Sequence, residues 1–127
     1  MGAHEEGRAL LDSAKSDLRA LLNMRDREAF DDRVVGFHAQ QAVEKALKAW
    51  LNALGEIHPY THDLRILLEK LETHGCNMES YWDFVELNSY ATRFRYESPP
   101  MDDEPLNREQ LGTDVCGLVE YVETLLI

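Results

Sequence analysis

The amino-acid sequence predicts an all-α protein, a five-helix up-and-down bundle, and three observations support this prediction. Apolar residues recur at three- and four-residue spacing along most of the chain, which is the pattern of helices that pack on one side. Glycine and proline residues lie where these patterns stop. No pair of segments has the alternating pattern of strands. We expect residues 1–127 to form a single domain, since a chain of this length supports one hydrophobic core.

The first two helices are predicted by their apolar sides. The first runs from about Ala3 to Met24, and its apolar side is made of Leu10, Leu11, Ala14, Leu18, Leu21 and Leu22. The second follows the charged stretch RDREAFDD and ends near Leu54, where Gly55 can adopt the left-handed conformation common at helix ends. Gly36 lies inside this second helix at only a modest cost in helix propensity.

The third and fourth helices are shorter. Pro59 interrupts the chain before the third helix, Thr61 is a candidate N-cap, and the helix ends at Gly75. The fourth helix is predicted in YWDFVELNSYATRFRY and ends near Tyr96. Its core stripe consists of Phe84, Leu87, Ala91 and Phe94.

The last helix follows a loop. The segment ESPPMDDEPLN contains three of the four prolines and several acids, which is typical of a loop. The fifth helix then runs from about Arg108 to Leu126, with Asn107 as the candidate N-cap. Its core side consists of Leu111, Val115, Leu118, Val122 and Leu125.

Charge and hydropathy limit the function. The net charge of −11 disfavours general coating of DNA or RNA, so contact with a phosphate has to use a local basic cluster. An acidic domain is equally suited to a basic partner protein. The apolar runs are too short to cross a membrane, and the N-terminal residues lack the order of a signal peptide. We therefore expect a cytoplasmic protein without membrane contact.

One polar arc on the second helix is the first candidate site. His38, Gln41, Lys45 and Lys48 follow one another at helical spacing and concentrate donors and positive charge on an acidic protein. Lysine binds phosphate as a point charge, and histidine can act as acid or base near neutral pH. The alternative is a solvated helix face with an ordinary pair between Glu44 and Lys48.

A second polar cluster lies where the fourth helix ends. Arg93 and Arg95 offer bidentate contacts to phosphate, and Tyr96 can stack on a base. The alternative is that these cations only stabilise the negative end of the helix dipole.

The sequence gives no reason to expect a metal or a cofactor. His58, His62 and Asp63 are close together, but Pro59 separates them and three ligands are too few for a structural zinc site. His62 and Asp63 are instead expected to cap the third helix. No glycine-rich phosphate loop or nucleophile elbow is present, so any catalysis is of the histidine acid/base kind.

Three segments carry a resemblance to a known family. They are FHAQQAVEKALKAWL, PYTHDLRILLEKL and ATRFRYE, in this order and at this spacing. Together they resemble HEPN domains from about Leu10 to the C-terminal residue. The family often has an Arg-Tyr-Pro string where this chain has Arg95, Tyr96 and Glu97. The resemblance implies an HEPN-like helical bundle, in agreement with the helices derived above.

The same resemblance implies a function. It implies a homodimer that binds a nucleotide or RNA phosphate and acts with a minimal nucleotidyltransferase as partner protein, in a toxin-antitoxin type of module. No nucleotidyltransferase segment is present in this sequence.

Some family members are metal-independent endoribonucleases with an arginine and a histidine at short spacing, which is the first alternative. Arg33 and His38 in RVVGFH satisfy that spacing, although Val34 follows the arginine where nuclease members carry a polar residue. His38 would then be acid or base toward the ribose 2′-hydroxyl, and Arg33 would stabilise the charge on phosphorus. The second alternative is a non-catalytic structural adaptor.

Overall fold

The computed structural model describes residues 2–91 and 105–127, and every regular element in these ranges is a helix. The elements are α1 (Gly2–Asn23), α2 (Asp32–Ala53), α3 (Leu64–Thr73), the 3₁₀ helix η1 (Glu79–Leu87) and α5 (Arg108–Leu125). The prediction of an all-α helical bundle is therefore confirmed. In the described ranges, no helix combines the length and the apolar character needed to span a bilayer.

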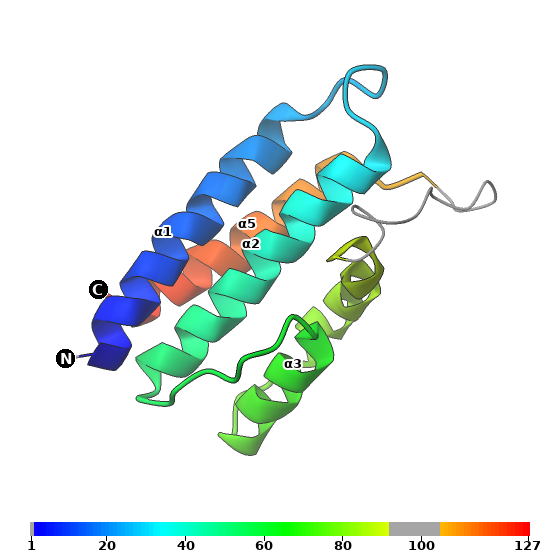
Figure 1. The fold of residues 1–127 in the computed structure, drawn as a ribbon. Coiled ribbons are helices and arrows are strands. Elements are labelled where there is room, and N and C mark those ends of the chain that lie inside the picture. The colour runs from blue at the N-terminus through cyan, green and yellow to red at the C-terminus, as the bar shows by residue number, and fades with distance from the viewer. Residues whose placement is uncertain (1, 92–104) are drawn as a thin grey trace.

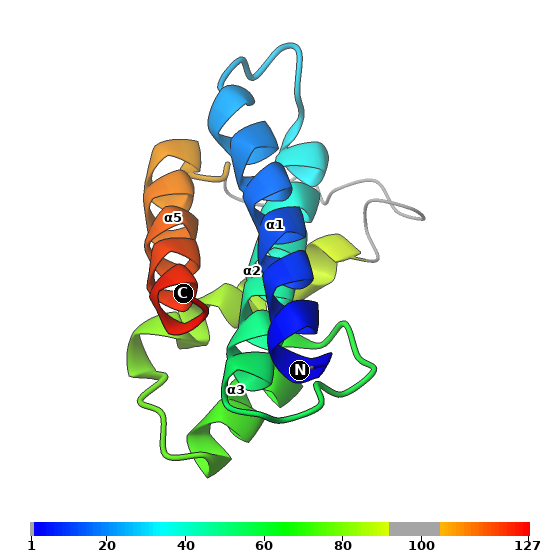
Figure 2. The same ribbon diagram turned by 90° about the vertical axis from the view of Figure 1, so that its left-hand side faces the viewer.

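Helix α2 is the centre of the bundle and contacts α1, α3, η1 and α5 (Figure 1). Helices α1 and α2 run side by side in opposite directions, and α5 packs along both (Figure 2). Most of the largest fully buried side chains come from α2, α3 and α5, and these include Val43, Leu47, Leu51, Leu64, Leu67, Leu68, Leu71, Val115 and Leu118. Because α2 is covered on several sides, its polar residues have to find partners inside the protein.

Side-chain caps and glycines define the helix ends. Asp31 caps α2 by accepting hydrogen bonds from two backbone N–H groups, and Asn107 caps α5 as predicted. Gly55 and Gly75 have φ values of 83° and 86°, so both predicted helix ends are confirmed. Of the residues predicted to cap α3, Asp63 is confirmed, because its carboxylate accepts from the Arg65 N–H, and Thr61 as the N-cap is wrong. Thr61 accepts a hydrogen bond from the Asp63 N–H and so orients the cap instead.

The predicted fourth helix begins as a 3₁₀ helix, which the apolar spacing did not indicate. Side chains three residues apart eclipse one another in a 3₁₀ helix, and Tyr81 and Phe84 accordingly stack with ring planes 11° apart. Phe84 and Leu87 are buried as predicted. An α-helical turn follows at residues 88–91, and the predicted end near Tyr96 lies outside the described residues.

Gly36 has a packing role inside α2. A Cβ atom at this position would lie 2.4 Å from the ring of Tyr90, so only glycine leaves room for the ring there. The cost of this glycine in helix propensity is therefore offset by the contact between α2 and the residues that follow η1.

Candidate functional site

A row of polar side chains is buried along α2. Gln40, Glu44, Lys48 and Asn52 follow one another at four-residue spacing, and each is less than 9% exposed. The loop of residues 54–63 folds back over this row. Asn52 donates to the Glu56 carbonyl, and Gln40 donates to the His62 carbonyl. The loop therefore supplies the partners that buried polar groups need.

The first of three similar clusters joins α1 to α2. The two carboxylate oxygens of Asp17 accept from Nδ1 of His38 at 3.0 Å and from Nζ of Lys45 at 2.7 Å. The side chain of Asp17 is 13% exposed, whereas those of His38 and Lys45 are 29% and 24% exposed. The carboxylate of Asp17 is thus more buried than its two partners, and the side chains of His38 and Lys45 both reach the surface.

The second cluster is built on Glu44 and lies under the loop. Glu44 contacts Nδ1 of His62 at 3.0 Å and Nζ of Lys48 at 3.0 Å. Glu44 and Lys48 are 5% and 11% exposed, so the predicted pair exists but is buried and not solvated. His62 is 75% exposed and covers the pair from outside.

The third cluster is built on Glu56 at the end of α3. Glu56 contacts His74 at 2.6 Å and Lys70 at 3.4 Å, and all three side chains are about one-third exposed or more. The hydrogen bond from His74, followed by that from Lys70, lowers the pKa of Glu56. In all three clusters, one carboxylate holds one histidine and one lysine.

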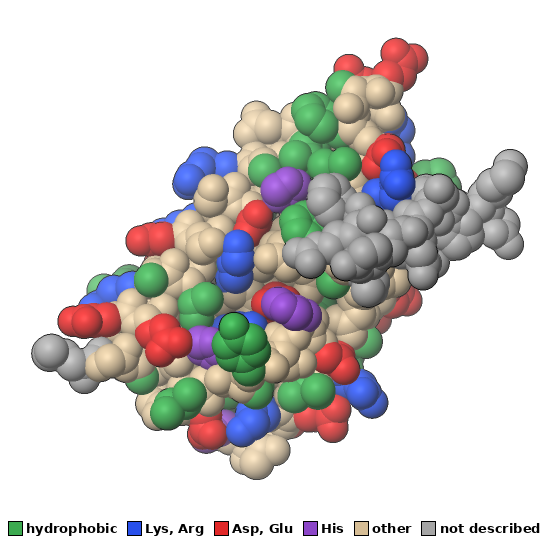
Figure 3. Space-filling model, in the orientation of Figure 1, with side chains coloured by type: hydrophobic (Ala, Val, Ile, Leu, Met, Phe, Trp, Pro, Cys, Tyr) green, Lys and Arg blue, Asp and Glu red, His purple; other side chains and the backbone are tan. Residues whose placement is uncertain are grey.

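Two hydrogen bonds extend the second cluster to Gln41, which lies one helical turn before Lys45 of the first cluster. Gln41 donates to the side-chain oxygen of Gln40 at 2.7 Å, and Gln40 donates to Glu44 at 3.0 Å. On the face drawn in Figure 3, histidine, basic and acidic side chains lie next to one another, with hydrophobic side chains beside them. We call the surface formed by Asp17, His38, Gln41 and Lys45 the α1/α2 polar face.

The predicted site residues thus separate into groups. His38, Gln41 and Lys45 lie on the α1/α2 polar face, and Asp17 joins the first and the last of them. Lys48 points to the buried Glu44 and is a partner of that carboxylate. Arg93, Arg95 and Tyr96 lie outside the described residues.

Arg33 lies in the first turn of α2, where its guanidinium pairs with Asp31 at 3.1 Å. Positions five apart on an α-helix differ by about 140° around the axis. Arg33 and His38 therefore point in different directions from α2, and Lys45 is the cation that shares a partner with His38.

Sequence reasoning missed the Asp17 partner and the role of His62. Asp17 lies between Ala14 and Leu21 at three- and four-residue spacing, so its position at the edge of the apolar side of α1 was a usable signal. The contacts of Glu44 with His62 depend on how the loop folds back, for which the sequence has no periodic signal.

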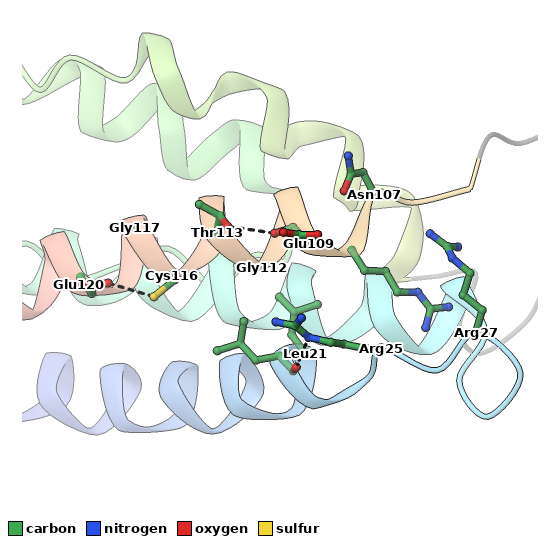
Figure 4. Close-up of a pocket in the computed structure, with 12 residues that line it drawn as sticks. Leu21, Arg25, Arg27, Asn107, Glu109, Gly112, Thr113, Cys116, Gly117 and Glu120 are labelled. Atoms are coloured by element: carbon green, nitrogen blue, oxygen red, sulfur yellow. Dashed lines mark hydrogen bonds between the residues drawn. The ribbon is translucent and has the colours of Figure 1, made fainter.

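The groove between α1 and α5, of about 730 Å³, is a second basic region (Figure 4). Arg108 donates to the carbonyls of Met24 and Phe30 and to Asp32, and is almost buried. Arg27 donates to the Leu106 carbonyl. These hydrogen bonds connect the loop between α1 and α2 to the start of α5. The arginines of this groove therefore stabilise the fold.

Cys116 in this groove is poorly suited to nucleophilic chemistry. Its thiol donates to the carboxylate of Glu120, and this hydrogen bond, together with burial, raises the pKa of Cys116. The thiolate, which is the reactive form, is therefore disfavoured. Among the described residues, no group of three or more His, Cys, Asp or Glu side chains is arranged to hold a metal ion.

The fold and the polar face define an all-helical domain whose histidine and lysine donors lie between its two antiparallel N-terminal helices. The family model of the HEPN domain matches residues 8–125, which is most of the chain. The protein belongs to the HEPN domain family. No curated protein and no solved structure gave a significant match.

Proposed function

We propose that this HEPN protein binds the phosphate of a nucleotide or RNA at the α1/α2 polar face. The observation that carries the proposal is the carboxylate of Asp17, which holds His38 and Lys45 side by side while both remain partly exposed. Asp17 restricts the rotamers of His38 and Lys45 before a ligand binds, so less conformational entropy is lost on binding. Lysine can then act as a point charge toward phosphate, with the Gln41 side chain one helical turn before it.

The protonation of His38 follows from its partner. A carboxylate can only accept, so Nδ1 of His38 carries a proton and Nε2 is the ring nitrogen left for a ligand. Within the described residues, Nε2 has no hydrogen-bond partner. It can accept a proton when the ring is neutral and donate to a phosphate oxygen when the ring is charged.

Calorimetry with adenosine monophosphate and with a short single-stranded RNA tests the proposal. Lys45→Gln and His38→Gln are expected to weaken binding by about tenfold each, as befits a lost charge-assisted hydrogen bond. Lys70→Gln and His74→Gln are matched controls, because they change the same residue types around Glu56 and are expected to leave affinity unaltered. If the two control variants lose as much affinity as Lys45→Gln and His38→Gln, or if the unmodified protein does not bind, phosphate binding at this face is refuted.

A partner and a dimer belong to the same proposal. Family membership supports a homodimer that acts with a minimal nucleotidyltransferase in a toxin-antitoxin type of module. Light scattering of the purified chain tests the dimer. Co-purification with a nucleotidyltransferase encoded in a neighbouring reading frame tests the proposed interaction. An unrelated protein of similar charge is the control.

Endoribonuclease activity is the second candidate, and the orientation of His38 favours it. A histidine whose Nδ1 is fixed by a carboxylate and whose Nε2 is open has the arrangement of a general acid or base. Lys45, which shares Asp17 with it, would stabilise charge on phosphorus. Cleavage of labelled RNA in the presence of chelator, lost in His38→Ala and in Lys45→Gln, is the expected result. If Arg33→Gln abolishes cleavage while Lys45→Gln retains full activity, the residue that stabilises charge on phosphorus is Arg33 and not Lys45.

A further inference from the structure

We propose that Tyr60 is a stacking platform for the base of the bound nucleotide or single-stranded RNA. Tyr60 was not among the residues singled out from the sequence. Its side chain is 104% exposed, so the ring makes no contribution to the core. The inference rests on the phosphate site proposed above, and it adds the nucleobase to that phosphate.

Tyr60 lies at the tip of a tight turn. The N–H of Thr61 donates to the carbonyl of Pro59 at 3.0 Å, which makes Tyr60 the central residue of a three-residue turn. Proline has a fixed φ angle, and the hydroxyl of Thr61 accepts from the N–H of Asp63. The backbone on both sides of the ring is therefore constrained.

The loop is also fastened to the bundle on both sides of this turn. Before it, Nδ1 of His58 lies 3.3 Å from the side-chain oxygen of Asn52 and 3.5 Å from Glu6. After it, His62 contacts Glu44 through its ring and Gln40 through its carbonyl. Because these contacts hold the loop in place, little conformational entropy is lost when the exposed ring of Tyr60 binds a ligand. Binding surfaces that use tyrosine have the same advantage.

The hydrogen bonds lead from this loop to the proposed phosphate site. Gln40, which holds the His62 carbonyl, also accepts from Gln41 on the α1/α2 polar face. Glu44, which holds the His62 ring, is next to Lys45 in α2. The hydrogen bonds of the anchored loop therefore reach Gln41, which lies one helical turn before Lys45 in α2.

The surroundings of Tyr60 favour a base over an apolar partner surface. Histidines lie two residues before and two residues after it, and both are polar at their ring nitrogens. A protein hot spot is normally enclosed by groups that exclude water. A ring with open faces between two histidines fits the stacking by which proteins bind single-stranded nucleic acid. Ile57, which is 82% exposed, is the apolar neighbour that tests this choice.

Three ligands separate the contributions of base and phosphate. They are adenosine monophosphate, a short single-stranded RNA and an abasic ribose-phosphate oligomer of equal length. Tyr60→Leu is expected to weaken binding of the RNA by at least about fivefold, and Tyr60→Phe to retain it within about twofold, because stacking needs the ring and not the hydroxyl. Neither variant is expected to change binding of the abasic oligomer. If Tyr60→Leu also weakens binding of adenosine monophosphate, Tyr60 stacks on the base of free nucleotides as well. If it weakens binding of the RNA alone, Tyr60 stacks only on bases of a strand.

Several results would overturn the inference. If Tyr60→Leu binds RNA as the unmodified protein does, while Lys45→Gln still weakens it, the phosphate site stands and the platform does not. If Ile57→Ser weakens RNA binding as much as Tyr60→Leu, the loop is an apolar contact surface and not a stacking site. If the unmodified protein binds neither oligomer, the proposed function fails together with the platform. Because the Tyr60 ring is fully exposed, thermal melting is expected to be the same in all Tyr60 variants.

Discussion

The Asp17 and Glu44 clusters contain the same kinds of side chain, a carboxylate, a histidine and a lysine, and differ in burial. Asp17 holds His38 and Lys45 on side chains that are 29% and 24% exposed. Glu44 holds Lys48 at 11% exposure beneath a histidine that is 75% exposed. A lysine near the surface can turn part of its hydrogen-bonding capacity toward a ligand, whereas a buried lysine has to keep its carboxylate. The comparison supports the proposal that the first cluster binds a ligand, and it explains why the second cluster contributes to stability.

The largest effect is expected at the buried cluster. Glu44→Gln leaves the ammonium of Lys48 without a charged partner, and breaking a buried pair in this way costs about 3–5 kcal/mol. Urea denaturation followed by circular dichroism measures the loss. The double variant Glu44→Leu with Lys48→Met, which removes both charges, should recover much of the stability. A loss in Glu44→Gln no greater than in a surface substitution such as Glu69→Gln would show that the pair is not buried in solution.

The next effect concerns the end of α2 that carries the Asp17 cluster. Gly36→Ala places a Cβ atom 2.4 Å from the Tyr90 ring, and overpacking of this kind costs about 1–3 kcal/mol. Gly117→Ala in α5 is the matched control, since nothing lies within 4 Å of the position its methyl group would take. Helix propensity should stabilise this control by up to about 1 kcal/mol. Thermal melting measures whether Gly36→Ala lowers the stability and Gly117→Ala raises it. Higher stability in both variants would contradict the contact between Tyr90 and α2.

Asp17→Asn should have a smaller effect on stability than Glu44→Gln. Its carboxylate accepts hydrogen bonds from Lys45 and His38, which are both partly exposed, so the expected loss of stability is about 1–2 kcal/mol. A double-mutant cycle with Lys45→Gln measures the coupling between the two side chains. Coupling as large as that between Glu44 and Lys48 would remove the distinction between the clusters.

The smallest effect concerns the cap that follows the loop. Burial is the largest single influence on Asp63 and by itself would raise its pKa. The hydrogen bonds from the Arg65 N–H and from the side chains of Asn88 and Arg65 together outweigh it, so the pKa of Asp63 is lowered. A carboxyl group with a lowered pKa in the folded state stabilises the protein above its ordinary pKa of about 4, and this contribution disappears as the pH falls through the folded value.

Asp63→Asn retains a capping side chain but cannot ionise, so it isolates this contribution. The variant is expected to be less stable by at most about 1 kcal/mol at about pH 7, and the difference should disappear as the pH falls below the ordinary carboxyl pKa of about 4 and through the lowered pKa of Asp63. Urea denaturation at several pH values checks this. A difference that grows as the pH falls would contradict the lowered pKa.

The sequence predicted the helices well because their packing depends on periodic burial. Leu11, Val43 and Val115 lie in the core as their spacing requires. The 3₁₀ form of η1 was not predictable, because Phe84 and Leu87 are three residues apart and this spacing fits both helix types. The capping residue of α3 was also ambiguous, since Thr61 and Asp63 are both good caps.

The candidate site was predictable only in part. Helical spacing correctly joined His38 to Lys45 on one face of α2, but their common partner Asp17 lies on another helix. The burial of Lys48 depends on residues 54–63 folding back over α2, which local pattern does not encode. Tyr60 lies in PYTHDLRILLEKL, one of the segments that carry the family resemblance, but no spacing pattern in the sequence singles it out.

The most direct test of the central claim is chemical-shift mapping on the ¹⁵N-labelled protein during titration with adenosine monophosphate. The account predicts saturable shifts for the backbone amides around Asp17 and from His38 to Lys45, with little change around the matched Glu56, Lys70 and His74 cluster. Shifts confined to the α1/α5 groove, equal shifts at the Glu56 cluster, or no shifts at saturating ligand would contradict it.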